Sequence, residues 1–292
     1  MAKQPPPQIK RASRKKGDRV TRFLVGGIVL SLVVIVLALW NPFKWFTSRT
    51  ARPTTEQAKQ RPEDRKQPAE KAGTVAIVID DLGQDLRSAR ELASVSKKIT
   101  FSVMPGLPQS RKVAELARKN GNEVFLHLPM EPKNANGRRP AAGTLRANMT
   151  PMEFMGTIAD DIASVPGAVG VNNHEGSDLT ENREAMKFLM AELKTRELRF
   201  LDSLTSSRSI AYATAKEFGL KAAKRDVFLD NDGENAAAIR KQLAELVRVA
   251  RKNGKAIGIG HPHPATIAEL KAWLAQADEQ GIEIVPVSKL MQ

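Results

Sequence analysis

Strand-like and helix-like stretches alternate along residues 73–292, and this pattern constrains the fold more than any other feature of the sequence. Short apolar runs, typical of buried strands, occur at 75–79, 99–103, 123–128, 168–171, 198–201, 220–223, 256–260 and 282–287. Amphipathic stretches between most of them predict helices at Leu86–Val95, Arg111–Asn120, Met152–Val165, Arg183–Thr195, Ser209–Phe218, Glu234–Asn253 and Pro264–Gln280. Such alternation produces parallel strands with right-handed crossovers, so we predict an α/β domain. About seven βα units favour a barrel or part-barrel over an open sheet.

An uncharged segment near the N-terminus predicts a membrane anchor. Phe23 to Trp40 holds eighteen residues without a charge, close to the length that a helix needs to cross a hydrocarbon core of about 30 Å. The alternative is a secretory signal peptide, which has a shorter apolar core and a small-x-small cleavage site. The stretch that follows, ALWNPFKWF, lacks such a site and supplies aromatic residues suited to an interface. We therefore predict one uncleaved transmembrane helix over residues 23–40.

The flanks of this segment indicate its orientation. Residues 1–22 carry eight Lys/Arg and one acid, Asp18, whereas residues 41–72 carry eight Lys/Arg and four acids. The positive-inside bias then makes residues 1–22 a basic cytoplasmic tail of a single-pass protein of the inner (cytoplasmic) membrane. The main domain, residues 73–292, would lie on the periplasmic or extracytoplasmic side. Residues 41–72 are rich in Pro, Gln and charge, and they predict a disordered linker.

The distribution of charge argues against a nucleic-acid partner. The chain has a formal net charge of +14, but residues 1–72 hold 16 Lys/Arg against 5 Asp/Glu, and residues 73–292 hold 30 against 27. The basic excess therefore lies mostly beside the predicted anchor, and the globular part is almost balanced. The absence of cysteine excludes disulfides and thiolate chemistry. The oligomeric state is left open by the sequence.

Acidic and imidazole side chains gather at the ends of the predicted strands. The run TVAIVIDDLG places Asp80 and Asp81 directly after five apolar residues. All four histidines of the chain, and Asp202, also fall at or just past strand ends: His127, His174, His261 and His263. Because the carboxyl ends of parallel strands meet on one side of a sheet, we expect these groups to lie together. One Asp with two or three His is the donor set of a catalytic divalent-metal site, although single histidines at strand ends are also common as structural residues.

Other polar residues allow more than one interpretation. Asn172 and Asn173 precede His174 and would either orient it, bind substrate or form a polar turn. Asp160 and Asp161 lie in the middle of a predicted helix, where we expect a solvent-facing surface.

Six motifs, in order, resemble the divergent polysaccharide deacetylase family. They are VAIVIDDLG, FSVMPGLP, VFLHLPMEP, GVNNHEGSDLT, FLDSLTSSRS and GIGHPHP, and they cover most of residues 74–290. The resemblance implies a distorted (β/α) barrel and a metal-dependent hydrolase. The resemblance does not extend to the first seventy residues.

The resemblance also implies roles for individual residues. The first acid of the pair, Asp80, would be the catalytic base, and Asp81 a metal ligand. His127 and His174 would be the other metal ligands, from separate strands, and His261 the general acid. We further expect Asn173, Asp202 and His263 to contact substrate, with His263 a possible substitute for His261. Family members often read NNHMGS, whereas this chain has Glu175 in place of Met.

Together these features predict a membrane-anchored hydrolase that removes N- or O-acetyl groups from an envelope polysaccharide or cell-wall glycan. The expected cofactor is a divalent metal ion, with zinc as the expected identity. Two alternatives stay open at this point. The fold could serve as a non-catalytic glycan-binding or envelope-interaction module, or the same site could act as a metal-dependent amidase on a peptide or a cell-wall crosslink.

Overall fold

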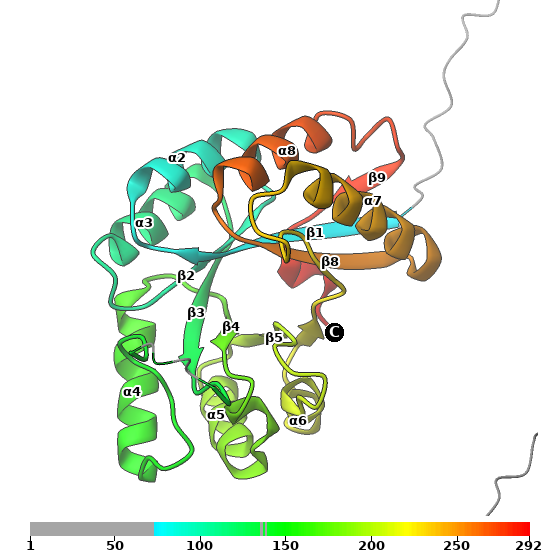
Figure 1. The fold of residues 1–292 in the computed structure, drawn as a ribbon. Helices are drawn as coiled ribbons and strands as arrows, with labels where there is room; N and C mark the ends of the chain where they lie inside the picture. Colours follow the sequence, from blue (N-terminus) through cyan, green and yellow to red (C-terminus); the bar gives the residue numbers. More distant parts are fainter. Residues whose placement is uncertain (1–72, 135–136, 138) are drawn as a thin grey trace, which may run out of the picture. The chain divides into compact units, whose positions relative to one another are not determined.

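Parallel strands form one curved sheet in the computed structural model, with helices along its outer side (Figure 1). The structure describes residues 73–134, 137 and 139–292. The strands are β1 (Gly73–Leu82), β2 (Thr100–Val103), β3 (Val124–Met130), β4 (Gly170–Glu175), β5 (Arg199–Asp202), β6 (Ala222–Lys224), β7 (Val227–Phe228), β8 (Lys255–Gly260) and β9 (Ile282–Ile284). The helices are α2 (Leu86–Val95), α3 (Ser110–Asn120), α4 (Pro151–Ser164), α5 (Arg183–Thr195), α6 (Ala211–Glu217), α7 (Ala236–Asn253) and α8 (Pro264–Leu274), with short 3₁₀ turns η1 (Leu179–Glu181) and η2 (Val287–Leu290).

The sheet confirms the predicted α/β class, and it has the form of a curled half-barrel. Its strand order is β6-β5-β4-β3-β2-β1-β8-β7, with β9 paired to β1, and every pairing is parallel. Within the described residues, no ladder joins the two end strands β6 and β7. The backbone of Gln292 instead pairs with Ala222 of β6, at 3.0 Å in one direction and 3.4 Å in the other. The C-terminal stretch thereby covers a strand edge that would otherwise be open.

Two apolar cores lie on the two faces of the sheet. The larger one is between strands and helices and includes Val75, Ile77 and Ile79 of β1. The smaller one lies inside the curl and contains Ala76 and Val78 of β1 together with residues of η2. Successive residues of a strand point to opposite faces, so β1 supplies both cores. An uninterrupted apolar run of this kind is the signature of a strand buried on both sides.

Caps and glycine turns in the sequence set several helix boundaries. Helix α4 begins with a capping box, in which Thr150 and Glu153 bond each other's backbone N–H groups. Helices α3 and α7 end at Gly121 and Gly254, which have φ of 91° and 78° and so adopt the left-handed conformation that glycine tolerates.

One helical position differs from the prediction. Asp161 of α4 is buried, with 7% of its surface exposed, whereas Asp160 faces solvent. Burial, with a smaller contribution from Asp160, raises the pKa of Asp161 to about 7. The expected solvent-facing acidic pair is therefore wrong for Asp161, because the helix turns this side chain inward.

Because Asp161 is buried, we expect the substitution Asp161→Asn to increase folding stability by an amount that depends on pH. The raised pKa in the folded state means that the neutral Asp161 side chain stabilises the fold. This stabilisation is complete below the unfolded-state pKa of 3.8 and is lost as the pH rises through about 7. We expect the variant to raise the free energy of unfolding by roughly 1–3 kcal/mol at about pH 8 and by little at about pH 4. Urea denaturation at both pH values measures this, with Asp160→Asn as the exposed control. An equal change at both pH values would contradict it.

The N-terminal predictions fall outside the described residues. These are the tail 1–22, the transmembrane helix 23–40 and the linker 41–72. Of the helices in the part of the chain that the structure describes, none is both long and apolar enough to cross a membrane.

Candidate metal centre and active site

Side-chain alternation along the strands turns several site residues toward the interior of the curl. Asp80 follows Val78 of the inner core by two positions, and His127 follows Phe125 of the same core by two. His261 stands just past β8, in the same register as the inward residues of that strand. Asp80 and His127 are almost fully buried, with 3% and 2% of their surfaces exposed. The carboxyl ends of three strands therefore bring an acid and two imidazoles to one place.

Asp81 reaches this place through an irregularity in the backbone. In a regular strand it would face away from its neighbour Asp80. Its φ of 55° lies in the left-handed region, and the pairing of β1 with β2 shifts register between Ile79 and Leu82. A bulge of this kind re-aims side chains near functional sites. The carboxylates of Asp80 and Asp81 thus lie at the same site.

Three donor atoms converge at this bulge. The Oδ1 atom of Asp81 lies 3.2 Å from Nε2 of His127 and 2.9 Å from Nδ1 of His174. The two ring nitrogens are themselves 3.3 Å apart. Two imidazole nitrogens and one carboxylate oxygen are a common ligand set for catalytic zinc, which keeps a further position open. The structure therefore brings together the three residues that the sequence suggested as ligands.

Electrostatics supports a cation at this cluster. Burial raises the pKa of Asp81, but contacts with His127 and His174 outweigh it and hold that pKa well below its usual range. Burial lowers the pKa of His127, but Asp80 and Asp81 outweigh it and raise that pKa above its ordinary value. Two carboxylates thus stabilise positive charge at this point. No donor among the described residues makes a hydrogen bond of regular geometry to the buried Oδ1 of Asp81. This donor set fits a divalent metal ion.

His261 is held by an acid that the sequence reasoning missed. Asp230, buried just after β7, places Oδ1 3.0 Å from Nδ1 of His261. Its Oδ2 accepts hydrogen bonds from the backbone N–H of His261, at 2.7 Å, and from Thr266 Oγ1, at 2.8 Å. Nε2 of the same ring lies 3.8 Å from Asp81 Oδ2, so the opposite edge of the imidazole faces the metal-ligand cluster.

This arrangement favours the protonated form of His261. Burial lowers its pKa, but the hydrogen bond and charge of Asp230, with Asp80 and Asp81 further away, outweigh burial and raise the pKa to about 9. Asp230 was missed because β7 has only two residues and gives no periodic signal. The available signal was the aspartate itself, directly after the apolar run Val227–Leu229.

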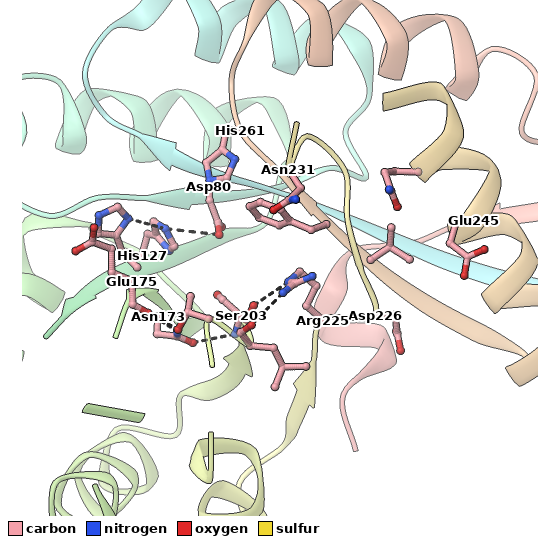
Figure 2. Close-up of a pocket in the computed structure, with 16 residues that line it drawn as sticks. Asp80, His127, Asn173, Glu175, Ser203, Arg225, Asp226, Asn231, Glu245 and His261 are labelled. Carbon is pink, nitrogen blue, oxygen red and sulfur yellow. Dashed lines mark hydrogen bonds and ion pairs between the residues drawn. The ribbon is translucent and has the colours of Figure 1, made fainter. Parts of the chain in front are cut away.

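An open cavity of about 650 Å³ extends from this cluster. Figure 2 shows Asp80, His127 and His261 on one side of it, and Glu245 of α7 on the other. The size is within the range of sites for small ligands. Its lining combines polar side chains, such as Asn231 and Gln242, with the apolar side chains of Val227 and Phe228.

Arg225 is a second functional candidate that the sequence reasoning missed. Its Nε and Nη2 atoms donate to the backbone carbonyls of Ser203, at 2.8 Å, and Leu204, at 3.0 Å (Figure 2). The guanidinium also lies 4.9 Å from the ring centroid of Phe228. Burial lowers the pKa of Arg225, while nearby acids, Asp80 first among them, act in the opposite direction. The residue places a fixed positive charge in the cavity wall.

The three predicted substrate contacts have two different outcomes. Asp202 is fully buried on the helix side of β5, like Phe200 two residues earlier. Its carboxylate accepts from Ser209 Oγ at 2.7 Å, and from the backbone N–H groups of Leu204 and Tyr212 at 2.9 and 3.3 Å. The substrate-binding prediction for Asp202 is therefore wrong, because alternation along β5 points this side chain away from the interior.

Asn173 and His263 lie closer to the site. Asn173 lines the cavity, but its amide already bonds the protein: Nδ2 donates to Glu175 O at 2.8 Å, and Oδ1 accepts from Ser203 N at 2.8 Å. His263 is the residue before helix α8, and its ring centroid lies 5.8 Å from that of His261. With Asp230 and His261 it forms a second group of potential metal ligands. A role in substrate binding for these two residues stays a prediction.

Comparison with known proteins shows the family of this chain. The model of the divergent polysaccharide deacetylase family matches residues 77–291, and the chain belongs to this family. It is 41% identical over 201 residues to the Escherichia coli K12 protein YibQ, a match that covers 68% of this chain and 62% of YibQ. It is 35% identical over 216 residues to an uncharacterized protein of Haemophilus influenzae, covering 74% of this chain and 76% of that protein.

A solved structure shows the same fold. The crystal structure of an uncharacterized protein from Agrobacterium tumefaciens C58 superposes with a TM-score of 0.72 at 29% sequence identity. The superposition covers 76% of this chain and 90% of that one.

Proposed function

We propose that this protein is a metal-dependent deacetylase that removes acetyl groups from an N- or O-acetylated envelope polysaccharide. One observation supports it above the others. Asp81, His127 and His174 converge from three strands, and Asp80 and His261 lie beside them. A base, an acid and a metal-ligand set around one open cavity are the groups that acyl hydrolysis needs.

The residues have distinct tasks in this reaction. A zinc ion held by Asp81, His127 and His174 would, when bound, polarise the acyl carbonyl and lower the pKa of a nearby water molecule. Asp80 accepts the proton of the attacking water. His261, held as an imidazolium by Asp230, donates its Nε2 proton to the leaving nitrogen or oxygen as the bond to the acyl carbon breaks. Asp230 acts through His261 and fixes its ring.

We also propose that residues 23–40 anchor the protein in the cytoplasmic membrane, with the deacetylase domain outside the cytoplasm. The uncharged length of that segment and the basic tail before it support this. Protease treatment of intact spheroplasts should degrade the C-terminal domain and spare a tag placed on the N-terminus. The reverse pattern would contradict the proposed orientation.

Metal removal tests the catalytic proposal. The full-length chain, purified in detergent, should contain about one zinc ion per chain and release acetate from N-acetylated glycan oligomers. Dialysis against a chelator should abolish acetate release, and added zinc should restore it. A chain that binds zinc and glycan without releasing acetate would identify a binding module instead. Release from an N-acetylated peptide alone would identify a peptide amidase.

A further inference from the structure

A buried chain of hydrogen bonds reaches Asp80 from strands β2 and β4 and from the loop after β5. Asn172 of β4 donates from Nδ2 to Asp80 Oδ1 at 2.9 Å and to Ser203 Oγ at 3.1 Å. Ser102 of β2 donates to Asn172 Oδ1 at 2.6 Å. Ser102 and Asn172 have no exposed surface, and Asp80 and Ser203 have 3% and 6%. The four side chains therefore form one buried hydrogen-bond network on the inner face of the sheet.

The chemistry of these groups fixes the direction of each bond. An ionised carboxylate can only accept hydrogen bonds, so Asn172 must turn its NH₂ group toward Asp80. The amide oxygen then faces Ser102, whose hydroxyl supplies the donor that this oxygen needs. The donors and acceptors of the Asn172 side chain are thus matched to partners from three different parts of the sheet.

We propose that Asn172 is the positioning residue for the catalytic base Asp80. By binding Oδ1, it leaves Oδ2 as the oxygen that faces the metal-ligand cluster, where Oδ2 lies 3.5 Å from His127 Nε2. Ser102 acts one step further back, by holding the Asn172 amide in the orientation that donates to Asp80. This inference rests on the proposed function, because it assumes that Asp80 takes the proton of the attacking water.

Burial makes this arrangement effective. Hydrogen bonds are stronger in a low-dielectric interior, and a fully satisfied buried network has one preferred geometry. A base that is free to rotate about its last bond would present its lone pairs in several directions. Because small misplacements of a reacting group cost large factors in rate, the fixed carboxylate should raise kcat.

Asn172→Ala and Asp80→Asn, alone and combined, test the inference. We expect Asn172→Ala to lower kcat by roughly 10- to 100-fold with KM within about twofold. We expect the same substitution to lower kcat by less than about threefold in a chain that already carries Asp80→Asn, because its effect passes through that carboxylate. Zinc content should stay at the wild-type value in all three variants.

Two further variants separate positioning from folding. Asn122→Ala removes another buried Asn, whose Nδ2 donates to the carbonyls of Ser96 and Ile99 at 2.8 and 2.9 Å, away from the site. It should lower the Tm as much as Asn172→Ala and leave kcat unchanged. Ser102→Ala keeps Asn172 in place and should cost kcat roughly 3- to 10-fold; it also serves if Asn172→Ala does not fold.

The possible results distinguish the two proposals. Equal losses from Asn172→Ala in the wild-type and Asp80→Asn chains would overturn the positioning role and leave the deacetylase intact. Wild-type kcat in Ser102→Ala and Asn172→Ala would do the same. Full activity in Asp80→Asn would instead remove the proposed base, and the positioning role with it.

Discussion

Asp81→Asn should leave the protein folded and abolish both zinc binding and acetate release. The carboxylate oxygen of Asp81 is the atom that both His127 and His174 approach. Changes to outer partners of metal ligands alone cost roughly 10- to 100-fold in affinity, so the loss of a ligand should cost at least about 100-fold. Asparagine is the suitable replacement, because it tolerates the positive φ of 55° at this position. Elemental analysis and an acetate assay on the same preparation measure both effects.

Asp85→Asn is the matched control for this variant. Asp85 is an exposed acid four residues further on, and its Oδ1 caps α2 by accepting from Arg87 N and Ser88 N at 2.8 and 2.9 Å. Asparagine keeps that cap, so metal content and activity should equal those of the wild type. His174→Ala should repeat the Asp81→Asn result from another strand. Wild-type zinc content in both site variants would rule out the proposed centre.

The alkaline side of the pH–rate profile should depend on Asp230. His261 must be protonated to donate, and its folded-state pKa is raised to about 9, so the proton is present below that value and is lost as the pH rises through it. A bound dication would move this limb to lower pH. Asp230→Asn removes the largest contribution that raises the His261 pKa and leaves the smaller ones of Asp80 and Asp81 against the lowering effect of burial. We therefore expect a further shift of roughly one to two units toward acid.

The size of the effect should therefore depend on pH. At about pH 8 the Asp230→Asn variant should lose roughly 2- to 10-fold in kcat/KM, with a much smaller loss at about pH 6. His261→Gln should lose roughly 100- to 10,000-fold across the whole range, because no proton donor remains. Asp232→Asn, an exposed acid in the same loop, is the control and should keep the wild-type profile. A pH-independent loss in Asp230→Asn would show that Asp230 has only a packing role.

The alternation of strands and helices could be predicted from local patterns. Apolar runs and amphipathic periods are properties of consecutive residues, and eight of the strands correspond to predicted runs. The missing strand, β7, has two residues and exists because it pairs with β8. The extent of the curl was also beyond local patterns, because it depends on whether the two end strands meet.

Some residues of the candidate site could likewise be predicted from the sequence, and others could not. Asp80, Asp81, His127, His174 and His261 were found because strand ends of a parallel sheet share one side. Asp230 and Arg225 were missed because their importance comes from contacts with His261 and with the loop after β5. Asp202 was assigned wrongly because one position along a strand reverses the face of a side chain.

The pair Asp80-Asp81 shows where the boundary between sequence and structure falls. By itself the sequence determined an α/β chain with acids and histidines at its strand ends, since these are questions of local pattern and composition. Only the tertiary structure decided that Asp81 turns back beside Asp80 through a left-handed residue, and that Asn172 holds the latter. Those facts depend on backbone dihedrals and on partners tens of residues away, which side-chain periodicity does not encode.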